Sequence, residues 1–432
     1  MLAETSSLLA ADLKHIWHPF TQMQTAAPPL PITRGEGSLL FDDQGNSYID
    51  GISSWWVNIH GHAHPYIAQK VYEQLKQLEH VIFAGFTHQP AVDIASRLLP
   101  KLPGKQNRVF FSDNGSTAVE VAIKMCLQYF YNQGNHKTHI VAFEDAYHGD
   151  TFGAMSAGAR SPFNAPFNPL LFEVIHIPIP EEGKEQESLT ALQQAIENHE
   201  VCAFIFEPLV QGAGGMNMYE PAALDALVGY CQANGVLCIA DEVMTGFGRT
   251  GRTFASEYLT NAPDLFCLSK GLTGGTLPLS ITTCTEKIFE AFLSNDPMKT
   301  FFHGHSFTAN PVGCAAALAS MDLLEHPDCQ ANIQRVSQRQ AEFAQSLQQH
   351  SNVRRIRQRG TITAMDIETG SATSYFNSVK KSVAPFFLER GILLRPLGNV
   401  LYVMPPYCTS DDQLNHIYAA VHEFLGSLAQ KA

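Results

Sequence analysis

The stretch DLFCLSKGLTGG, residues 264–275, brings an apolar run to a lysine and follows that lysine with a glycine-rich loop. The apolar run predicts a buried strand over Asp264–Ser269, so Lys270 stands at the strand's end. A lysine that loses hydration there has a lowered amine pKa and a larger neutral, nucleophilic fraction, as a Schiff-base lysine requires. The alternative is a lysine that caps a strand and points into water, and the stretch alone does not exclude it.

Length and composition limit the classes of protein that fit. The chain has 432 residues, enough for one large domain with a smaller companion. Its net charge of −13 argues against a nucleic-acid binder, because phosphate neutralisation needs a basic face. No apolar run approaches the ~18 residues of a membrane helix, and residues 1–14 lack the pattern of a signal peptide. Nine scattered cysteines without a CxxC pair indicate reduced thiols in a cytoplasmic protein.

Strand and helix patterns alternate through the middle of the chain. Seven strands are predicted: Arg108–Ser112, His139–Phe143, Glu173–Pro178, Val201–Glu207, Val236–Asp241, Asp264–Ser269 and Leu279–Cys284. Several are nearly continuous apolar runs, typical of strands buried on both faces of a mostly parallel sheet. Helical segments at Ser116–Gln133, Leu189–Asn198 and Pro221–Asn234 separate several of them. The sequence therefore predicts an α/β domain in which helices flank a mostly parallel seven-stranded sheet.

The two ends of the chain have a different pattern. Long helices are predicted over Pro311–Glu325 and Asp328–His350, followed by strands Thr361–Ile367, Leu393–Pro396 and Asn399–Met404 and a helix Asp411–Leu428. Residues 1 to about 50 look loop-like because prolines break them, apart from short strands at Ser38–Asp42 and Ser47–Asp50. We expect a large domain over 53–326 and a small α+β domain over 327–432, which residues 1–52 join.

Chemically suggestive residues follow the predicted strands, where parallel sheets bind ligands. Gly115 and Ser116 begin a helix, and the free N–H groups and positive dipole end of a helix start suit a phosphate. An ordinary Ser/Thr N-cap explains the same residues without a ligand. Tyr147 follows the second strand, where its ring either covers a flat cofactor or packs against the protein. Each feature is ambiguous by itself.

A buried carboxylate and the lysine together favour one cofactor. Asp241 closes the fifth apolar strand, and such a carboxylate is costly to bury unless a cation or a hydrogen-bond donor meets it. An acid beside a ring nitrogen and a lysine for an imine are the protein groups that pyridoxal phosphate requires. The helix start and the tyrosine supply the remaining contacts. Four features at strand ends therefore predict a site for pyridoxal 5'-phosphate.

Several further strings resemble the class III aminotransferases, which are fold-type I pyridoxal-phosphate enzymes, and the resemblance covers almost the whole chain. The strings are HIWHPF at 15–20, SSWW at 53–56, YHGDTFGAMS at 147–156, EPLVQGAGGM at 207–216, GFGRTG at 246–251 and RPLG at 395–398. The resemblance implies that Lys270 bonds the cofactor and that Asp241 pairs with its ring nitrogen. It implies further that Gly115 and Ser116 hold the phosphate and that Tyr147 lies near the ring and the substrate. The implied reaction is a transamination with ping-pong kinetics.

The same resemblance implies a homodimer with shared active sites. His305 and Ser306 match a segment that in this family reaches the cofactor phosphate of the neighbouring subunit. Trp55, Gly304 and Arg395 match positions that contact substrate. Arginine suits a carboxylate because it can bind both oxygens at once. Small molecules are therefore the expected partners.

Different residues indicate the acceptor and the donor of the amino group. SSWW and Arg395 resemble the branch of the family that aminates 8-amino-7-oxononanoate in biotin biosynthesis, with S-adenosyl-L-methionine as donor. Phe20 departs from that branch, whose members often carry a tyrosine there. The strings PFTQM at 19–23 and HGHS at 303–306 look more like relatives that use lysine as donor. Arg249 is a second candidate near the substrate.

Other functions remain as alternatives. L-lysine as donor and a generic ω-aminotransferase are rivals within the enzymes, and a non-catalytic pyridoxal-phosphate-binding protein is a rival of another class. The presence of both Lys270 and Asp241 argues against the last. The string HGHAH at 60–64 lacks a carboxylate or cysteine to complete a metal site, so no metal is expected. GAGG at 212–215 is not the dinucleotide fingerprint, which makes a nicotinamide dehydrogenase a poor candidate.

Overall fold

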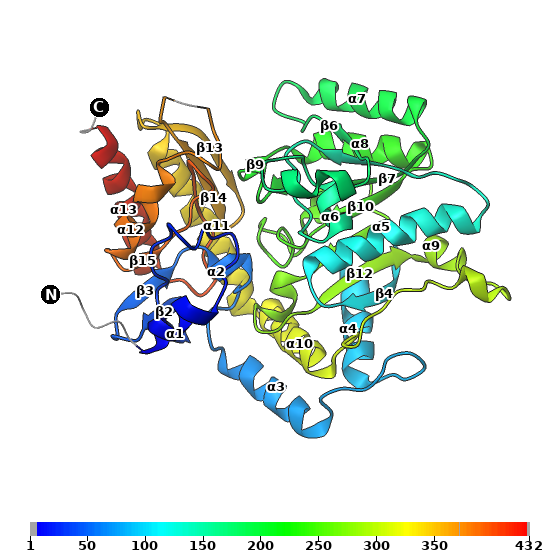
Figure 1. Cartoon of the computed structure of the whole chain (residues 1–432), viewed down its shortest axis with the longest axis horizontal. Coiled ribbons are helices and arrows are strands. Elements are labelled where there is room, and N and C mark those ends of the chain that lie inside the picture. The colour runs from blue at the N-terminus through cyan, green and yellow to red at the C-terminus, as the bar shows by residue number, and fades with distance from the viewer. Residues whose placement is uncertain (1–6, 371, 430–432) are drawn as a thin grey trace.

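The computed structural model describes residues 7–370 and 372–429 and contains two packed bodies (Figure 1). One body holds the middle of the chain and the other holds both of its ends. Among the described residues no helix has the length and apolar content needed to cross a membrane. The division of the chain at residues 52 and 326 stays a prediction.

A seven-stranded sheet forms the centre of the larger body, in the order β4-β12-β11-β10-β7-β5-β6. Its strands are β4 (Gln106–Ser112), β5 (His139–Phe143), β6 (Ile175–Ile177), β7 (Val201–Phe206), β10 (Leu237–Asp241), β11 (Leu265–Leu268) and β12 (Ser280–Thr285). Only β12 is antiparallel to its neighbours within this sheet. All seven predicted strands are present in it, and the prediction of a mostly parallel sheet is confirmed. The carboxyl ends of β4, β5, β7, β10 and β11 therefore meet at one edge.

Helices cover both faces of this sheet (Figure 1). The helices of this body are α3 (Pro65–Gln77), which packs on α10 and not on the sheet, and α4 (Gln89–Leu98), α5 (Gly115–Asn132), α6 (Phe152–Ala157), α7 (Glu185–Asn198), α8 (Pro221–Ala233), α9 (Glu286–Glu290) and α10 (Pro311–Glu325). Alternate residues of one strand enter different cores: Leu237 and Ile239 pack with α5, whereas Cys238 and Ala240 pack with α8. Burial on both faces explains why β7, β10 and β11 are continuous apolar runs.

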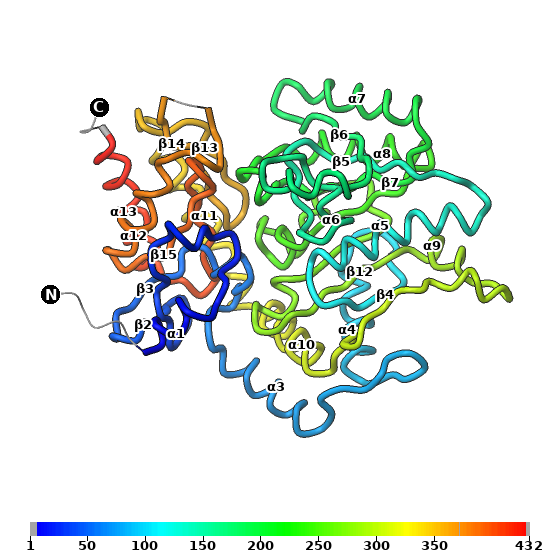
Figure 2. Tube along the Cα trace, viewed as in Figure 1, coloured from blue at the N-terminus to red at the C-terminus, as the bar shows by residue number. Residues whose placement is uncertain are grey.

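The smaller body joins segments from both ends of the chain, which lie side by side in Figure 2. One sheet has the order β1-β2-β3-β15 and the other β13-β14-β16. The strands are β1 (Ile32–Glu36), β2 (Leu39–Asp42), β3 (Ser47–Asp50), β13 (Val353–Arg359), β14 (Ile362–Ile367), β15 (Ile392–Leu393) and β16 (Val400–Val403). Because β3 runs parallel to β15, residues 51–56 and residues 394–395 leave the same edge.

Four helices and a short distorted one complete the smaller body. They are α1 (Ser7–His15), α2 (Ser53–Trp56), α11 (Pro327–Leu347), α12 (Lys380–Leu388) and α13 (Asp411–Ala429). The expectation of a loop was wrong for residues 7–15, because the prolines that break the N-terminal segment begin only at Pro19. It was also wrong for β1, which pairs with β2. Strand β13 and helix α12 were not predicted. β13 is rich in arginine, and α12 contains Pro385, so neither follows the usual sequence pattern.

Candidate active site

Lys270 follows β11 and begins a short 3-10 turn, Lys270–Thr273. Its φ of 46° lies in the left-handed region, which non-glycine residues adopt rarely and often at functional sites. The residue is half-buried, and its Nζ lies 5.0 Å from the centroid of the Trp56 ring. Burial lowers the pKa of the amine, while the carboxylates of Asp241 and Glu207 act against that change. The amine is therefore desolvated, as a Schiff-base lysine requires.

Asp241 ends β10, which pairs directly with β11, and its side chain is almost fully buried. Its Oδ2 lies 2.7 Å from His148 Nδ1, and its Oδ1 accepts a hydrogen bond from Val243 N at 3.1 Å. The carboxylate is thus fixed in place beside the lysine strand. His148 is also buried and was not singled out from the sequence, although it stands next to Tyr147. A signal was available, because a histidine commonly meets a buried carboxylate.

The start of α5 is built to leave two backbone amides outside the helix cap. Asn114 is the N-cap and forms a capping box with Thr117. The amides of Gly115 and Ser116 take no part in that cap, so they stay free to bind an anion. Ser116 Oγ accepts a hydrogen bond from the N–H of Asp150, which brings the loop after β5 against the helix start. Such an arrangement suits a phosphate.

Glycine allows this close approach of loop and helix. A Cβ on Gly149 would lie 2.0 Å from Ser116 Oγ, and Gly149 has a φ of 129°. A Cβ on Gly115 would lie 2.7 Å from a methyl carbon of Val243, in the loop after β10. Three segments therefore converge on the helix start only because both positions lack a side chain.

Glu207 is a buried carboxylate that the sequence analysis missed. It directly follows β7, as Asp241 ends β10, and this shared position at the end of a buried strand was the signal that could have found it. The backbone N–H groups of Tyr147 and Gly212 donate to its two oxygens at 3.1 and 2.8 Å. Burial raises the pKa of Glu207 to about 7, and Asp241 contributes in the same direction. Glu207 thereby fixes the backbone from which the Tyr147 ring projects.

Tyr147 itself is partly exposed. Burial of the phenol raises its pKa, and Asp150 adds to that effect. The hydroxyl therefore stays protonated and can donate a hydrogen bond at neutral pH.

A second group of residues lies at the mouth of the site, on the smaller body. The Arg395 Cζ lies 4.9 Å from the centroid of the Trp55 ring, and the Phe20 ring lies 5.7 Å from that ring. Phe163 extends the aromatic surface, with its ring 6.4 Å from Phe20 and 4.7 Å from Tyr375. Trp55, Phe20 and Arg395 are all exposed. A guanidinium over an aromatic face offers its edge to a carboxylate.

Arg249 is fully buried, unlike Arg395. Its guanidinium donates to the carbonyl oxygens of Pro405 at 2.9 Å and Trp56 at 3.4 Å. It lies close enough to Lys270 to lower the pKa of that amine. The structure thus places Arg249 near the site but ties its side chain to the backbone, and a contact with substrate stays a prediction.

The segment with Gly304, His305 and Ser306 lies elsewhere. It packs near α5, where His303 Nδ1 is 3.0 Å from Lys124 Nζ. Among the described residues no hydrogen bond joins it to Lys270 or to the start of α5. A role for His305 and Ser306 in a neighbouring subunit stays a prediction.

Two of the three histidines in residues 60–64 have hydrogen-bond partners. His60 Nε2 lies 3.0 Å from the carbonyl of Ser320, and His62 Nε2 lies 2.8 Å from Asp50 Oδ2. Burial lowers the pKa of His60 to about 3. Within residues 7–370 and 372–429, no group of three or more His, Cys, Asp or Glu side chains is arranged to hold a metal.

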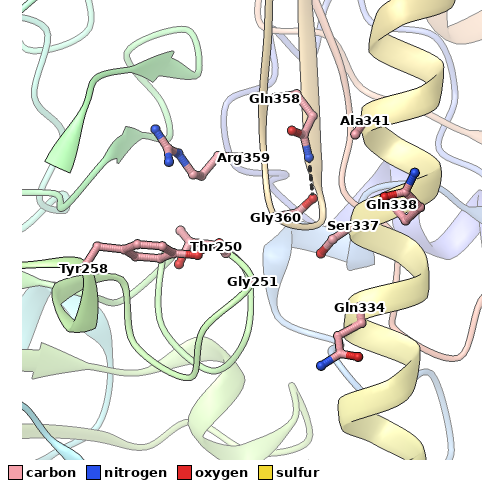
Figure 3. A pocket seen from close by; sticks show the side chains of 10 residues that line it. All are labelled: Thr250, Gly251, Tyr258, Gln334, Ser337, Gln338, Ala341, Gln358, Arg359 and Gly360. Atoms are coloured by element: carbon pink, nitrogen blue, oxygen red, sulfur yellow. Dashed lines mark hydrogen bonds between the residues drawn. The ribbon is translucent and has the colours of Figure 1, made fainter.

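An open polar groove of about 400 Å³ lies between the loop at Thr250 and helix α11 (Figure 3). Gln334, Ser337 and Gln338 line it from the helix, and Gln358 beside it donates to the carbonyl of Gly360. None of the predicted site residues lines this groove. We therefore assign the chemistry to the edge of the seven-stranded sheet.

A desolvated lysine, a fixed acid and a helix start with two free backbone amides, all at one sheet edge, suit pyridoxal phosphate. The chain belongs to the class III aminotransferases: the family described as Aminotransferase class-III matches residues 21–425. It is 51% identical to the adenosylmethionine-8-amino-7-oxononanoate aminotransferase of Synechococcus elongatus, over 96% of this chain and 99% of the relative. The enzyme of that name from Geobacter sulfurreducens is 40% identical over 96% of each chain.

Solved structures agree with the fold. The adenosylmethionine-8-amino-7-oxononanoate aminotransferase of Methanocaldococcus jannaschii has a TM-score of 0.92 and 35% identity, covering 97% of this chain and 98% of that one. The omega transaminase of Pseudomonas jessenii in complex with PMP has a TM-score of 0.93 and 26% identity, covering 98% and 99%. The prediction of a fold-type I pyridoxal-phosphate enzyme with a class III aminotransferase activity is therefore confirmed.

Proposed function

We propose that this enzyme transfers an amino group from S-adenosyl-L-methionine to 8-amino-7-oxononanoate, forming 7,8-diaminononanoate in biotin biosynthesis. The observation that carries the proposal is the shared name of relatives that align over 96% to 99% of the chain. The exposed guanidinium of Arg395 over the Trp55 ring supports it, because the acceptor is a carboxylic acid.

The residues at the sheet edge have distinct tasks in this proposal. Pyridoxal phosphate, when bound, withdraws electrons from the carbon that bears the reacting amine. Lys270 bonds the cofactor, and its desolvated amine removes a proton from that carbon once substrate has displaced it. Asp241 holds the proton of the ring nitrogen, and His148 fixes the carboxylate at 2.7 Å. The amides of Gly115 and Ser116 bind the phosphate, since Asn114 caps the helix without them.

The mouth of the site selects the substrates. Arg395 binds the acceptor's carboxylate, and Trp55 holds the guanidinium in place. Tyr147 donates from its protonated hydroxyl near the reacting amine. Phe20 and Arg249 complete the lining of the substrate site. Phe20 contributes from the exposed aromatic surface, and Arg249 contributes from the buried side.

The proposed assembly is a cytoplasmic homodimer in which Gly304, His305 and Ser306 complete the neighbouring site. Two exposed phenylalanines in this segment, Phe302 and Phe307, support an interface there, because large apolar side chains in water favour association. The nine described cysteines are all free thiols, in keeping with a reducing compartment. Light scattering on the holoenzyme tests the assembly: a fully active monomer would contradict it.

L-Lysine as donor is the second candidate, and Phe20 is the observation that favours it, because no hydroxyl stands at that position. The test is to add S-adenosyl-L-methionine or L-lysine to the yellow holoenzyme and to follow the visible absorbance of the cofactor. Bleaching by S-adenosyl-L-methionine alone is the expected result. Bleaching by L-lysine alone would replace the donor, and bleaching by neither would contradict both candidates.

A further inference from the structure

The loop that carries Trp55 has an unusual backbone. Ser53, Ser54 and Trp56 have φ values of 52°, 58° and 68°, all in the left-handed region that favours glycine. None of the three is a glycine, so each conformation is strained. Backbone of this kind persists only where the surrounding structure holds it, and it is concentrated at functional sites.

Asp50 is the group at its centre, and its side chain is completely buried. Its Oδ1 accepts from Ile52 N at 3.2 Å, and its Oδ2 accepts from Ser54 N at 2.7 Å and Ser54 Oγ at 3.3 Å. His62 Nε2 lies 2.8 Å from the same Oδ2. A buried carboxylate needs such partners, and here two of them are backbone N–H groups of the strained loop itself. Asp50 therefore fixes the course of the chain into Trp55.

The position of Asp50 links this loop to Arg395. Asp50 is the last residue of β3 and stands opposite Leu393 in the parallel strand β15. The two strands therefore deliver Trp55 and Arg395 from the same edge, and the guanidinium lies over the Trp55 ring at 4.9 Å. Both strands end before they reach Trp55 and Arg395, so strand pairing does not fix the positions of these side chains. The hydrogen bonds from the loop to Asp50 fix the position of Trp55.

We infer that Asp50, assisted by His62, is a positioning residue that holds Trp55 against Arg395 and so orients the guanidinium toward the carboxylate of the acid substrate. The inference rests on the proposed function, because it takes 8-amino-7-oxononanoate as that acid. Asp50 is completely buried, and its carboxylate contacts the loop backbone and His62. Its effect passes through Trp55, so its loss should weaken recognition of the carboxylate more than it weakens the chemistry.

The test compares 8-amino-7-oxononanoate with its methyl ester, which has the same reacting carbonyl but no carboxylate charge. For Asp50→Asn, kcat/KM for the acid should fall about tenfold, the size of a hydrogen bond to a charged group, and mainly through KM. The ester, which gains little from Arg395, should lose less than about threefold by the same reasoning. Cofactor affinity, measured by titrating the apoenzyme, should change less than KM for the acid, because Gly115, Ser116 and Asp241 lie on the other body.

Two further variants keep the test decisive. Asp43→Asn makes the same chemical change at an exposed turn residue and should leave both substrates unaffected. His62→Ala removes one of the partners of Asp50 and should shift the acid-to-ester ratio in the same direction by a smaller factor. It replaces Asp50→Asn if that protein does not fold.

The possible outcomes separate the two claims. Equal losses on acid and ester, or no loss on either, would overturn the positioning role while the proposed function stands. A wild-type enzyme that does not aminate the acid at all would overturn the proposed function, and with it the premise of this inference.

Discussion

The two halves of the active site are built in different ways. The cofactor half lies at the edge of one continuous sheet, and Asp241 there is only 4% exposed. The substrate half comes from both ends of the chain, and Trp55 and Phe20 are 42% and 52% exposed. Under the proposed function, buried titratable groups give the first half its chemistry, and exposed rings with one guanidinium give the second its selectivity. Substitutions in the first half should therefore affect kcat or stability, and those in the second should affect KM.

Lys270→Ala should have the largest effect. Loss of both the covalent anchor and the base should lower kcat by at least about 10³-fold, within the range of general acid–base catalysis alone. The measurement is single-turnover bleaching of the holoenzyme by donor. Lys105→Ala, which changes an exposed lysine, is the matched control and should behave as wild type. Turnover of the Lys270 variant near the normal rate would contradict the assignment.

Glu207→Gln tests whether burial in the cofactor half costs stability. The pKa of Glu207 is raised from 4.5 to about 7, so the folded chain binds this proton more tightly than the unfolded chain does. The free energy of unfolding should therefore fall as the pH rises from about 4.5 to about 7 and then level off. Glutamine has no such dependence. Between about pH 4.5 and about pH 7, the free energy of unfolding of Glu207→Gln should therefore rise by on the order of 3 kcal/mol relative to that of wild type.

Apparent Tm values of the apoenzyme between pH 5 and pH 8 measure this difference. Glu79→Gln changes an exposed glutamate and should not alter the pH profile. If the profiles of wild type and Glu207→Gln run parallel, Glu207 is not protonated in the folded chain at pH 5 to 7.

Arg395→Ala tests the substrate half. Removing the guanidinium should raise KM for 8-amino-7-oxononanoate by about 10- to 100-fold, since hydrogen bonds to charged groups contribute about 1.5–3 kcal/mol. kcat should change much less. Arg395→Lys should recover only part of the loss, because a lysine cannot bind both carboxylate oxygens in the same plane. A fall in kcat without a change in KM would place Arg395 in the cofactor half.

The sequence could predict where the residues of the cofactor half lie because they stand at strand ends. The end of a continuous apolar run marks the end of a buried strand. The structure brings Asp241, Lys270 and the start of α5 to one edge of the sheet, as the strand pattern predicts. Glu207 was missed although it has the same signal as Asp241. Nothing local distinguishes a carboxylate that meets a ring from one that meets two backbone N–H groups.

The substrate half could be predicted only through resemblance. Phe163 and Tyr375 are more than 200 residues apart, and their rings meet only after both bodies have packed. Asp50 gave no signal because its task is to hold a strained backbone, and φ values cannot be obtained from residue types alone. Contacts of this kind depend on tertiary packing, which periodicity does not encode.

Phe20→Tyr should have the smallest effect and is the finest probe of the substrate half. The Phe20 ring already lies against Trp55 at 5.7 Å, so a tyrosine fits the same exposed place and adds a hydroxyl facing solvent or substrate. If S-adenosyl-L-methionine is the donor, one new hydrogen bond should lower its KM by about two- to tenfold, with kcat unchanged. KM for 8-amino-7-oxononanoate should move less, because in the proposed function Arg395 holds its carboxylate. Phe163→Tyr adds a hydroxyl one ring further from Trp55 and is the matched control.

An equal fall in KM for the donor in both variants would mean that the polarity of the mouth matters and the position of the hydroxyl does not. A rise in KM for the donor would mean that the phenylalanine is itself the adapted residue, and would favour L-lysine as the amine that this enzyme accepts.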